Sequence, residues 1–141
     1  MRSELFENML IRPGFVKLDG SNFEEAKQAS GHLMLFCTGD PKQRPESLDL
    51  AIILPELYQS FSARFRVGVV DSDIEERMEQ DYGVQQWPTL VLLRDGEYVG
   101  SIPRLRDWAE YLQEITALLQ APVKQGKVYK TFVINQSQGC A

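Results

Sequence analysis

The sequence predicts an α/β domain of three layers, an α/β/α sandwich whose central sheet mixes parallel and antiparallel strands. Three observations support this prediction. Helix and strand patterns alternate along most of the chain, as they do where helices connect parallel strands. The almost continuously apolar run Leu33–Thr38 is typical of a strand that is buried on both faces. Asp95-Gly96 lies between two apolar runs and predicts a β-hairpin, which makes part of the sheet antiparallel.

The first part of the chain shows helix and strand patterns that are separated by turn residues. We expect a helix at residues 3–11, which a Pro-Gly pair ends, and a short strand at residues 15–18. A second helix, at about residues 22–29, follows an Asp-Gly turn and is capped by Ser21 or Asn22. The buried apolar strand comes directly after it.

The middle of the chain predicts a loop and then two helices with a strand between them. Two prolines, a glycine and alternating charges make residues 39–46 a loop. The helix that follows, at residues 47–61, contains Pro55, which removes a backbone donor and should kink it. A strand is expected at residues 64–71, and a short, very polar helix at residues 73–80.

The last part of the predicted domain is the hairpin and a closing helix. The two strands of the hairpin are expected at residues 90–94 and 97–102. We expect Pro103 to open the closing helix, because proline suits the first helical turn. Its apolar face is formed by four residues in helical spacing: Trp108, Leu112, Ile115 and Leu119.

A single domain accounts for the chain. With 141 residues, of which 43% are hydrophobic, the chain has apolar material for one sizeable core and not for two. We expect this domain to span residues 1–121. Residues 122–141 are polar except for the run at residues 129–134, so we expect a mobile C-terminal tail with one candidate short strand.

Composition argues against several classes of protein. The net charge of −5 disfavours nucleic acid and anionic membranes as partners. One histidine, His32, and two separate cysteines, Cys37 and Cys140, form no zinc-type spacing, so we expect no metal and no cofactor. Unpaired cysteines favour a reducing compartment. The N-terminal residues do not resemble a secretory signal and no apolar run is long enough for a bilayer, so a cytoplasmic location is expected.

Several local features resemble the thioredoxin family. Trp87-Pro88-Thr89 leads into an apolar strand, where thioredoxins have a cis-proline before a threonine, and Pro55 matches their helix-kinking proline. The resemblance covers about residues 15–119 and implies the thioredoxin-like fold. Counted back from Pro55, the two active-site cysteines of that family fall near Ser47 and Leu50, neither of which forms a thiolate. This departure from the thioredoxin pattern therefore excludes dithiol exchange.

The loop that replaces the dithiol resembles a narrower group. Asp40-Pro41-Lys42, followed by Pro45-Glu46, is similar to the nickel–iron hydrogenase accessory proteins of the HyaE/HupG/HoxO type. An acidic segment after the third strand and the run Trp87–Val91 match the same group. The resemblance implies a non-catalytic cytoplasmic chaperone. Its partner would be the hydrogenase small-subunit precursor with its twin-arginine signal peptide, bound before export, with other hydrogenase accessory proteins as further candidates.

Three groups of residues are candidates for contacts with such a partner. They are the acidic run Asp71, Asp73, Glu75, Glu76 and Glu79; the pair Trp87 and Pro88; and the loop charges Asp40, Lys42, Arg44 and Glu46. A dense acidic run costs stability unless something offsets it, and arginine pairs bidentately with carboxylates. The simpler alternative is a solvated helix face, in which Asp73 only stabilises the helix start.

Two other functions stay open from the sequence. A monothiol redox protein would use Cys37 or Cys140 and requires an accessible thiol of low pKa. Cys37 lies in an apolar strand, where a thiol usually is buried and inert. The third alternative is a thioredoxin-like interaction module of another system, with the same fold and a different partner.

Overall fold

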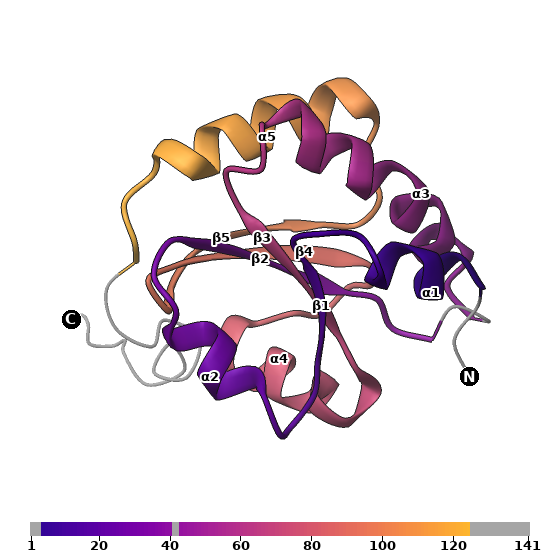
Figure 1. Ribbon diagram of the computed structural model, residues 1–141, viewed down its shortest axis with the longest axis horizontal. Coiled ribbons are helices and arrows are strands. Elements are labelled where there is room, and N and C mark those ends of the chain that lie inside the picture. Colours follow the sequence, from indigo (N-terminus) through magenta and orange to yellow (C-terminus); the bar gives the residue numbers. More distant parts are fainter. Residues whose placement is uncertain (1–3, 41–42, 125–141) are drawn as a thin grey trace.

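The computed structural model describes residues 4–40 and 43–124, and Figure 1 shows how their helices and strands are layered. The predictions for Lys42, for Cys140 and for the tail beyond Lys124 fall outside the described residues. The elements in chain order are α1 (Glu4–Leu10), β1 (Phe15–Leu18), α2 (Phe23–Gln28), β2 (His32–Cys37), α3 (Pro45–Ser60), β3 (Arg66–Val70), the 3₁₀ helix η1 (Ser72–Ile74), α4 (Glu75–Tyr82), β4 (Thr89–Arg94), β5 (Glu97–Pro103) and α5 (Trp108–Gln120).

The five strands form one mixed sheet in the order β1-β3-β2-β4-β5. β3 pairs in parallel with both β1 and β2, whereas β4 pairs antiparallel with β2 and with β5. The central strand β2 is buried from Leu33 to Cys37, as its continuous apolar run predicts. The mixed α/β sheet confirms the predicted fold class.

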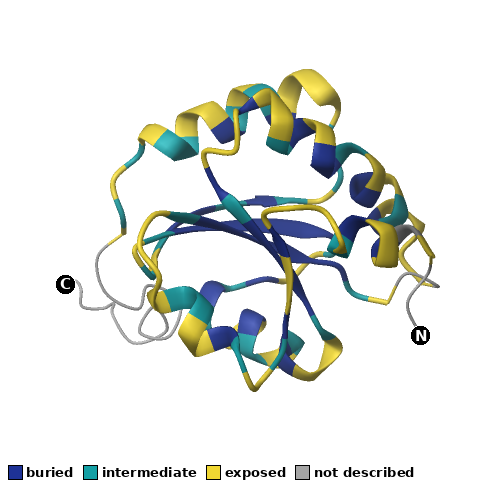
Figure 2. Ribbon diagram, viewed as in Figure 1, coloured by how far each residue is buried: buried dark blue, intermediate teal, exposed yellow. Residues whose placement is uncertain are grey.

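The sheet separates two apolar clusters. Alternate residues of β2 point to opposite faces, so Met34 and Phe36 join one cluster and Leu33 and Leu35 join the other. The first cluster lies against α1, α3 and α5, and the second against α2 and α4 (Figure 1). Figure 2 shows the buried sheet between helices whose outer faces are exposed. No helix among the described residues is long and apolar enough to cross a bilayer.

Most predicted helices and strands occur close to their predicted bounds, and α3 shows one difference. It begins at Pro45, two residues before the expected start, because proline has no N–H to leave unpaired in a first helical turn. The helix continues through Pro55, which is buried.

The prediction that Pro103 opens the last helix is wrong. Pro103 is the final residue of β5, an edge strand in which a missing N–H is tolerated. The helix starts at Trp108, after a reciprocal capping box: Asp107 accepts from the Glu110 N–H at 2.8 Å, and Glu110 accepts from the Asp107 N–H at 3.1 Å.

The later start changes the buried face of α5. Tyr111 and Ile115 are buried, whereas Trp108, which was expected on this face, is 40% exposed. Trp108 stands in the first turn next to the cap, where it does not reach the core. Leu112 and Leu119 are half-buried and pack at the margin of the first apolar cluster.

Candidate functional site

Ser47 and Leu50, near which the count back from Pro55 places the thioredoxin dithiol, are both buried. Ser47 is fully buried, and its hydroxyl donates a hydrogen bond to the Thr38 carbonyl just beyond β2. Leu50, three residues later, is a core residue of the first apolar cluster. Neither side chain is exposed to solvent, so any contact with a ligand at this end of the sheet must come from residues of the surrounding loops.

Cys37 is the last residue of β2 and is 0% exposed. Burial raises the pKa of its thiol far above the usual range, and the charge of Glu75 adds to that increase. A thiol that is both buried and protonated is neither accessible nor nucleophilic. The structure therefore contradicts a monothiol role for Cys37.

The acidic run is split between different faces of η1 and α4. Asp71 caps η1, with its side chain accepting from the Asp73 N–H. Along α4, residues four apart share a face, so Glu75 lies on the same face as Glu79, and Glu76 on the same face as Gln80. The run is thus not one continuous acidic face, as its spacing along the chain might imply.

One face of α4 is used to hold α2. Arg77 forms an ion pair with Glu24 of α2 and another with Asp81 at 3.3 Å, and its guanidinium lies 4.7 Å from the centre of the Phe23 ring. These contacts offset part of the acidic charge within the protein itself. Sequence patterns did not indicate Glu24, because the contact depends on how two separate helices pack.

Glu75 is the residue at which two of the predicted groups meet. Burial raises the pKa of its carboxyl group above the ordinary value. The neighbouring carboxylates of Asp71, Glu79 and Asp40 raise it further. The guanidinium of Arg44 acts in the opposite direction. The acidic run and the loop after β2 are therefore close enough for charges of the loop to act on Glu75.

Strand pairing explains this proximity. β2 and β3 are parallel neighbours with Cys37 opposite Val70, so the segments that follow the two strands leave the same edge of the sheet. Asp40 lies in the segment after β2, and Asp71 lies directly after β3. We call the four carboxylates Asp40, Asp71, Glu75 and Glu79 the acidic edge.

The turn before β4 lies beside the acidic edge. Trp87 is half-buried, and the peptide bond between Trp87 and Pro88 is cis. Gly39 has φ +68°, and a Cβ added to it would lie 3.0 Å from the Trp87 Cβ and 3.5 Å from the Arg44 Cγ. The loop after β2 therefore approaches Trp87 closely, and a glycine permits that approach.

Other predicted residues lie outside this group. Asp73 is exposed and accepts a hydrogen bond from the Gly20 N–H at 3.2 Å, so it joins η1 to the turn after β1. Glu76 is exposed on α4, within 3.5 Å of the Gln80 side chain. Glu46 is exposed in the first turn of α3, where a negative charge favours the helix dipole.

Among residues 4–40 and 43–124, no three histidine, cysteine, aspartate or glutamate side chains are placed to hold a metal ion. The acidic edge and Trp87 instead offer a negative surface beside an aromatic ring. Such a surface suits a basic, extended ligand.

The fold places this protein in a class. A thioredoxin variant from Halobacterium salinarum has a similar structure, with a TM-score of 0.62 at 20% identity over 77% of this chain and 93% of the other. This chain is therefore a thioredoxin-like domain.

The particular family follows from sequence comparison. The family model for hydrogenase-1 expression protein HyaE matches residues 5–111. Hydrogenase expression/formation protein HoxO of Cupriavidus necator is 36% identical over 86% of this chain and 77% of that protein. HupG of Bradyrhizobium diazoefficiens is 31% identical over 96% of this chain and 95% of that relative. A crystal structure of the hydrogenase expression/formation protein HupG from Rhodopseudomonas palustris is similar, with a TM-score of 0.52 and 32% identity over 73% of this chain and 93% of the other. The chain belongs to the HyaE family of hydrogenase expression proteins.

Proposed function

We propose that this protein is a non-catalytic, cytoplasmic maturation chaperone of a nickel–iron hydrogenase, and that it binds the small-subunit precursor through its twin-arginine signal peptide before export. Membership of the HyaE family gives the chain a role in hydrogenase maturation. The acidic edge beside Trp87 is the observation that supports this choice of ligand.

The electrostatics of Glu75 favour an arginine-rich ligand. Burial raises the pKa of Glu75, and the carboxyl groups around it raise the pKa further. Lys17 pairs with Asp71 at 3.7 Å, and a further cation at Glu75 would relieve the remaining repulsion between carboxylates. Guanidinium groups form two parallel hydrogen bonds with a carboxylate, whereas an ammonium group forms a less directional contact. Two adjacent arginines therefore match the acidic edge better than two lysines do.

Trp87 supplies the apolar part of the proposed contact. Half-exposed aromatic side chains are effective anchors for a bound peptide. Trp87 lies close to Gly39, which directly precedes Asp40 of the acidic edge, so a peptide bound at that edge is expected to reach the ring. Binding should change the fluorescence of Trp87 and leave Trp108, which lies at the start of α5, unchanged.

The test is a titration of the full chain with a synthetic signal peptide of the small-subunit precursor, in a Trp108→Phe background. We expect saturable quenching or enhancement of Trp87 that weakens several-fold between about 50 mM and about 300 mM salt. Glu75→Gln with Glu79→Gln should weaken binding by about tenfold or more. Glu56→Gln, at an exposed position on α3, is the matched control and should bind as the parent does.

A twin-lysine peptide distinguishes specific pairing from general charge attraction. We expect it to bind more weakly than the twin-arginine peptide at equal net charge. Equal affinity for both peptides would count against the proposed ligand. So would a lack of saturation at tens of micromolar peptide, because the binding free energy would then be weaker than roughly 6 kcal/mol.

A further inference from the structure

Arg104 is an exposed cation that the backbone holds beside the turn carrying Trp87. It follows β5 directly, and its N–H donates to the Pro88 carbonyl at 2.8 Å. Its own carbonyl accepts from the hydroxyl of the buried Tyr111 at 3.3 Å. Its φ is +65°, a left-handed conformation that glycine adopts freely and an arginine does not. Hydrogen bonds on both sides thus keep an arginine where the backbone alone would favour glycine.

The register of the sheet places Arg104 and the acidic edge at opposite ends of one row. One residue from each of β3, β2, β4 and β5 pairs with the next along this row: Val70, Cys37, Thr89 and Pro103. Asp71 comes directly after the first of these residues, and Arg104 directly after the last. Pro88 directly precedes Thr89, so the turn that carries Trp87 lies between charges of opposite sign.

The acidic residues that follow Arg104 in the chain are already engaged. Asp107 and Glu110 form the capping box of α5, and Glu114 accepts from the Arg106 guanidinium at 2.6 Å. In the part of the chain that the structure describes, no carboxylate forms an ion pair with Arg104. Its guanidinium is therefore available to a ligand.

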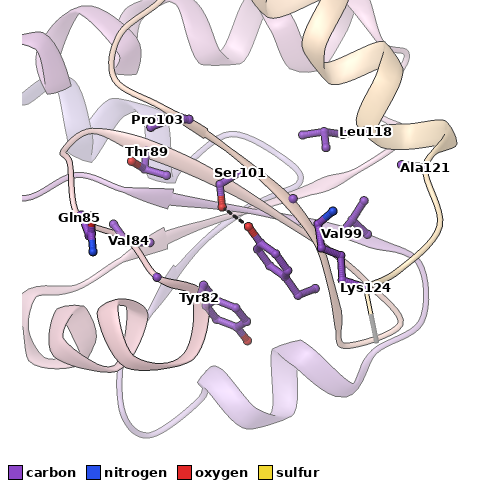
Figure 3. Close-up of a pocket in the computed structure, with 13 residues that line it drawn as sticks. Tyr82, Val84, Gln85, Thr89, Val99, Ser101, Pro103, Leu118, Ala121 and Lys124 are labelled. Atoms are coloured by element: carbon purple, nitrogen blue, oxygen red, sulfur yellow. Dashed lines mark hydrogen bonds between the residues drawn. The ribbon is translucent and has the colours of Figure 1, made fainter. Parts of the chain in front are cut away.

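The pocket along β5 does not neutralise Arg104 either. This pocket has a volume of about 490 Å³, and its lining includes Thr89 and Pro103 of the row (Figure 3). The described residues that line it include one charged side chain, the cation Lys124, and no acid. A carboxylate that pairs with Arg104 would thus come from a bound ligand.

The distance along the row determines how far apart the charges of such a ligand must be. β5 is two strands from β2 and three strands from β3, which corresponds to about 10 Å and about 14 Å. An extended peptide rises about 3.3 Å per residue. A peptide that crosses the turn along this row therefore spans the two charged ends with three or four residues.

We propose that Arg104 is a specificity-determining residue, which selects a segment with a carboxylate three or four residues from its arginine pair. This role rests on the proposed function, in which the arginine pair binds the acidic edge. A guanidinium donates two parallel hydrogen bonds to a carboxylate. Opposite charges at the two ends also fix the direction of the peptide, because the reversed peptide would place its arginines against Arg104.

The test measures the binding of synthetic twin-arginine peptides to the full chain by Trp87 fluorescence, in the Trp108→Phe background. Each peptide carries one glutamate three or four residues before or after the arginine pair, and its matched peptide carries glutamine there. We expect at least one glutamate position to improve binding by about threefold or more. Arg104→Gln should abolish this preference. Arg64→Gln removes the same charge at an exposed position before β3, at the opposite end of the sheet, and should retain it.

Arg104→Gly separates a binding role from a structural one. Glycine adopts the same φ without strain, so this variant should keep or raise the melting temperature while it loses the preference for glutamate. Equal affinity of the parent chain for all matched pairs would overturn the inference, as would a preference that persists in Arg104→Gln or Arg104→Gly. If the parent chain binds none of the peptides, the proposed ligand itself is wrong and the role of Arg104 is rejected with it.

Discussion

At the scale of single residues, Ser47 accounts for the absence of dithiol chemistry at the position where thioredoxins carry it. Its side chain points into the protein and donates to the Thr38 carbonyl, so the position is part of the packing between β2 and α3. A thiol introduced there would inherit the same burial. The lack of a surface thiol here therefore depends on packing as well as on residue type, because position 47 is fully buried.

We predict that Ser47→Cys does not create a reactive thiol. In a Cys140→Ser background, the variant should react slowly with a thiol reagent when native and completely when denatured. Loss of the hydrogen bond to Thr38 should lower the free energy of unfolding by about 1 kcal/mol. Rapid reaction of one thiol in the native protein would show that the loop opens more readily than its packing implies.

The raised pKa of Glu75 predicts a pH-dependent effect on stability. A carboxyl group whose pKa is higher in the folded state binds more protons there, so its contribution to stability is lost as the pH rises through the folded pKa. Glu75→Gln should therefore raise the free energy of unfolding at pH 7 by about 0.5 kcal/mol, given screening by solvent. Below the ordinary carboxyl pKa the two proteins should be equally stable. Thermal unfolding at pH 7 and at about pH 4 measures the difference.

The control for this prediction is Glu97→Gln. Glu97 is exposed at the start of β5, so its replacement should change the melting temperature little at either pH. A stabilisation that is equal for both variants would assign the effect to the net charge of the protein and not to the surroundings of Glu75.

At the scale of elements, α4 joins the acidic edge to the packing of α2. Its Glu75 face borders the loop after β2, and its Arg77 face contacts Glu24 and the ring of Phe23. We expect Arg77→Ala to lower the free energy of unfolding by about 1 kcal/mol, through loss of a cation–π contact and partly exposed ion pairs. Urea unfolding measures this change. Arg77→Lys should restore only part of it, because an ammonium group cannot stack as a planar guanidinium does.

The capping box predicts the energetics of α5. Asp107→Ala removes one side of the reciprocal pair with Glu110 and should cost about 1 kcal/mol of stability. Asp49→Ala, at an exposed position within α3, is a matched control that removes an acid without removing a cap. Similar losses in both variants, measured by urea unfolding, would argue against a capping role for Asp107.

The element scale also explains which predictions from sequence succeed. The hairpin and β2 are correctly predicted because their signals, an Asp-Gly turn and a continuous apolar run, are local. Pro103 was misassigned because proline is tolerated both in a first helical turn and in an edge strand. Pairing of Pro103 with Thr89 decides between the two, and that pairing depends on contacts between strands.

At the scale of the whole molecule, the sheet determines the composition of the candidate site. Sequence patterns identified the acidic run, the Trp87 turn and the charged loop separately. The parallel register of β2 against β3 brings Asp40 and Arg44 to Glu75, and no local pattern reports that register. The same packing removes Asp73 and Glu76 from the group. Sequence therefore predicted the residue types of the site better than their grouping.

The shared sheet predicts that both apolar clusters unfold together. Trp87 packs against one cluster, and Trp108 begins the helix that covers the other. The Trp108→Phe and Trp87→Phe proteins each keep one tryptophan. In each protein, the midpoint of unfolding by tryptophan fluorescence should equal the midpoint by helical circular dichroism. After correction for any change in stability, the midpoints of the two proteins should also coincide. Separate midpoints would indicate that the two faces of the sheet are independent.

The turn that carries Trp87 is fastened to the end of β5, because the Arg104 N–H donates to the Pro88 carbonyl at 2.8 Å. Thr89, the next residue of that turn, also lines the pocket along β5. A ligand in that pocket and a peptide at Trp87 would therefore contact the same turn. Whatever factor the first imposes on the affinity for the second, the second must impose on the affinity for the first in return.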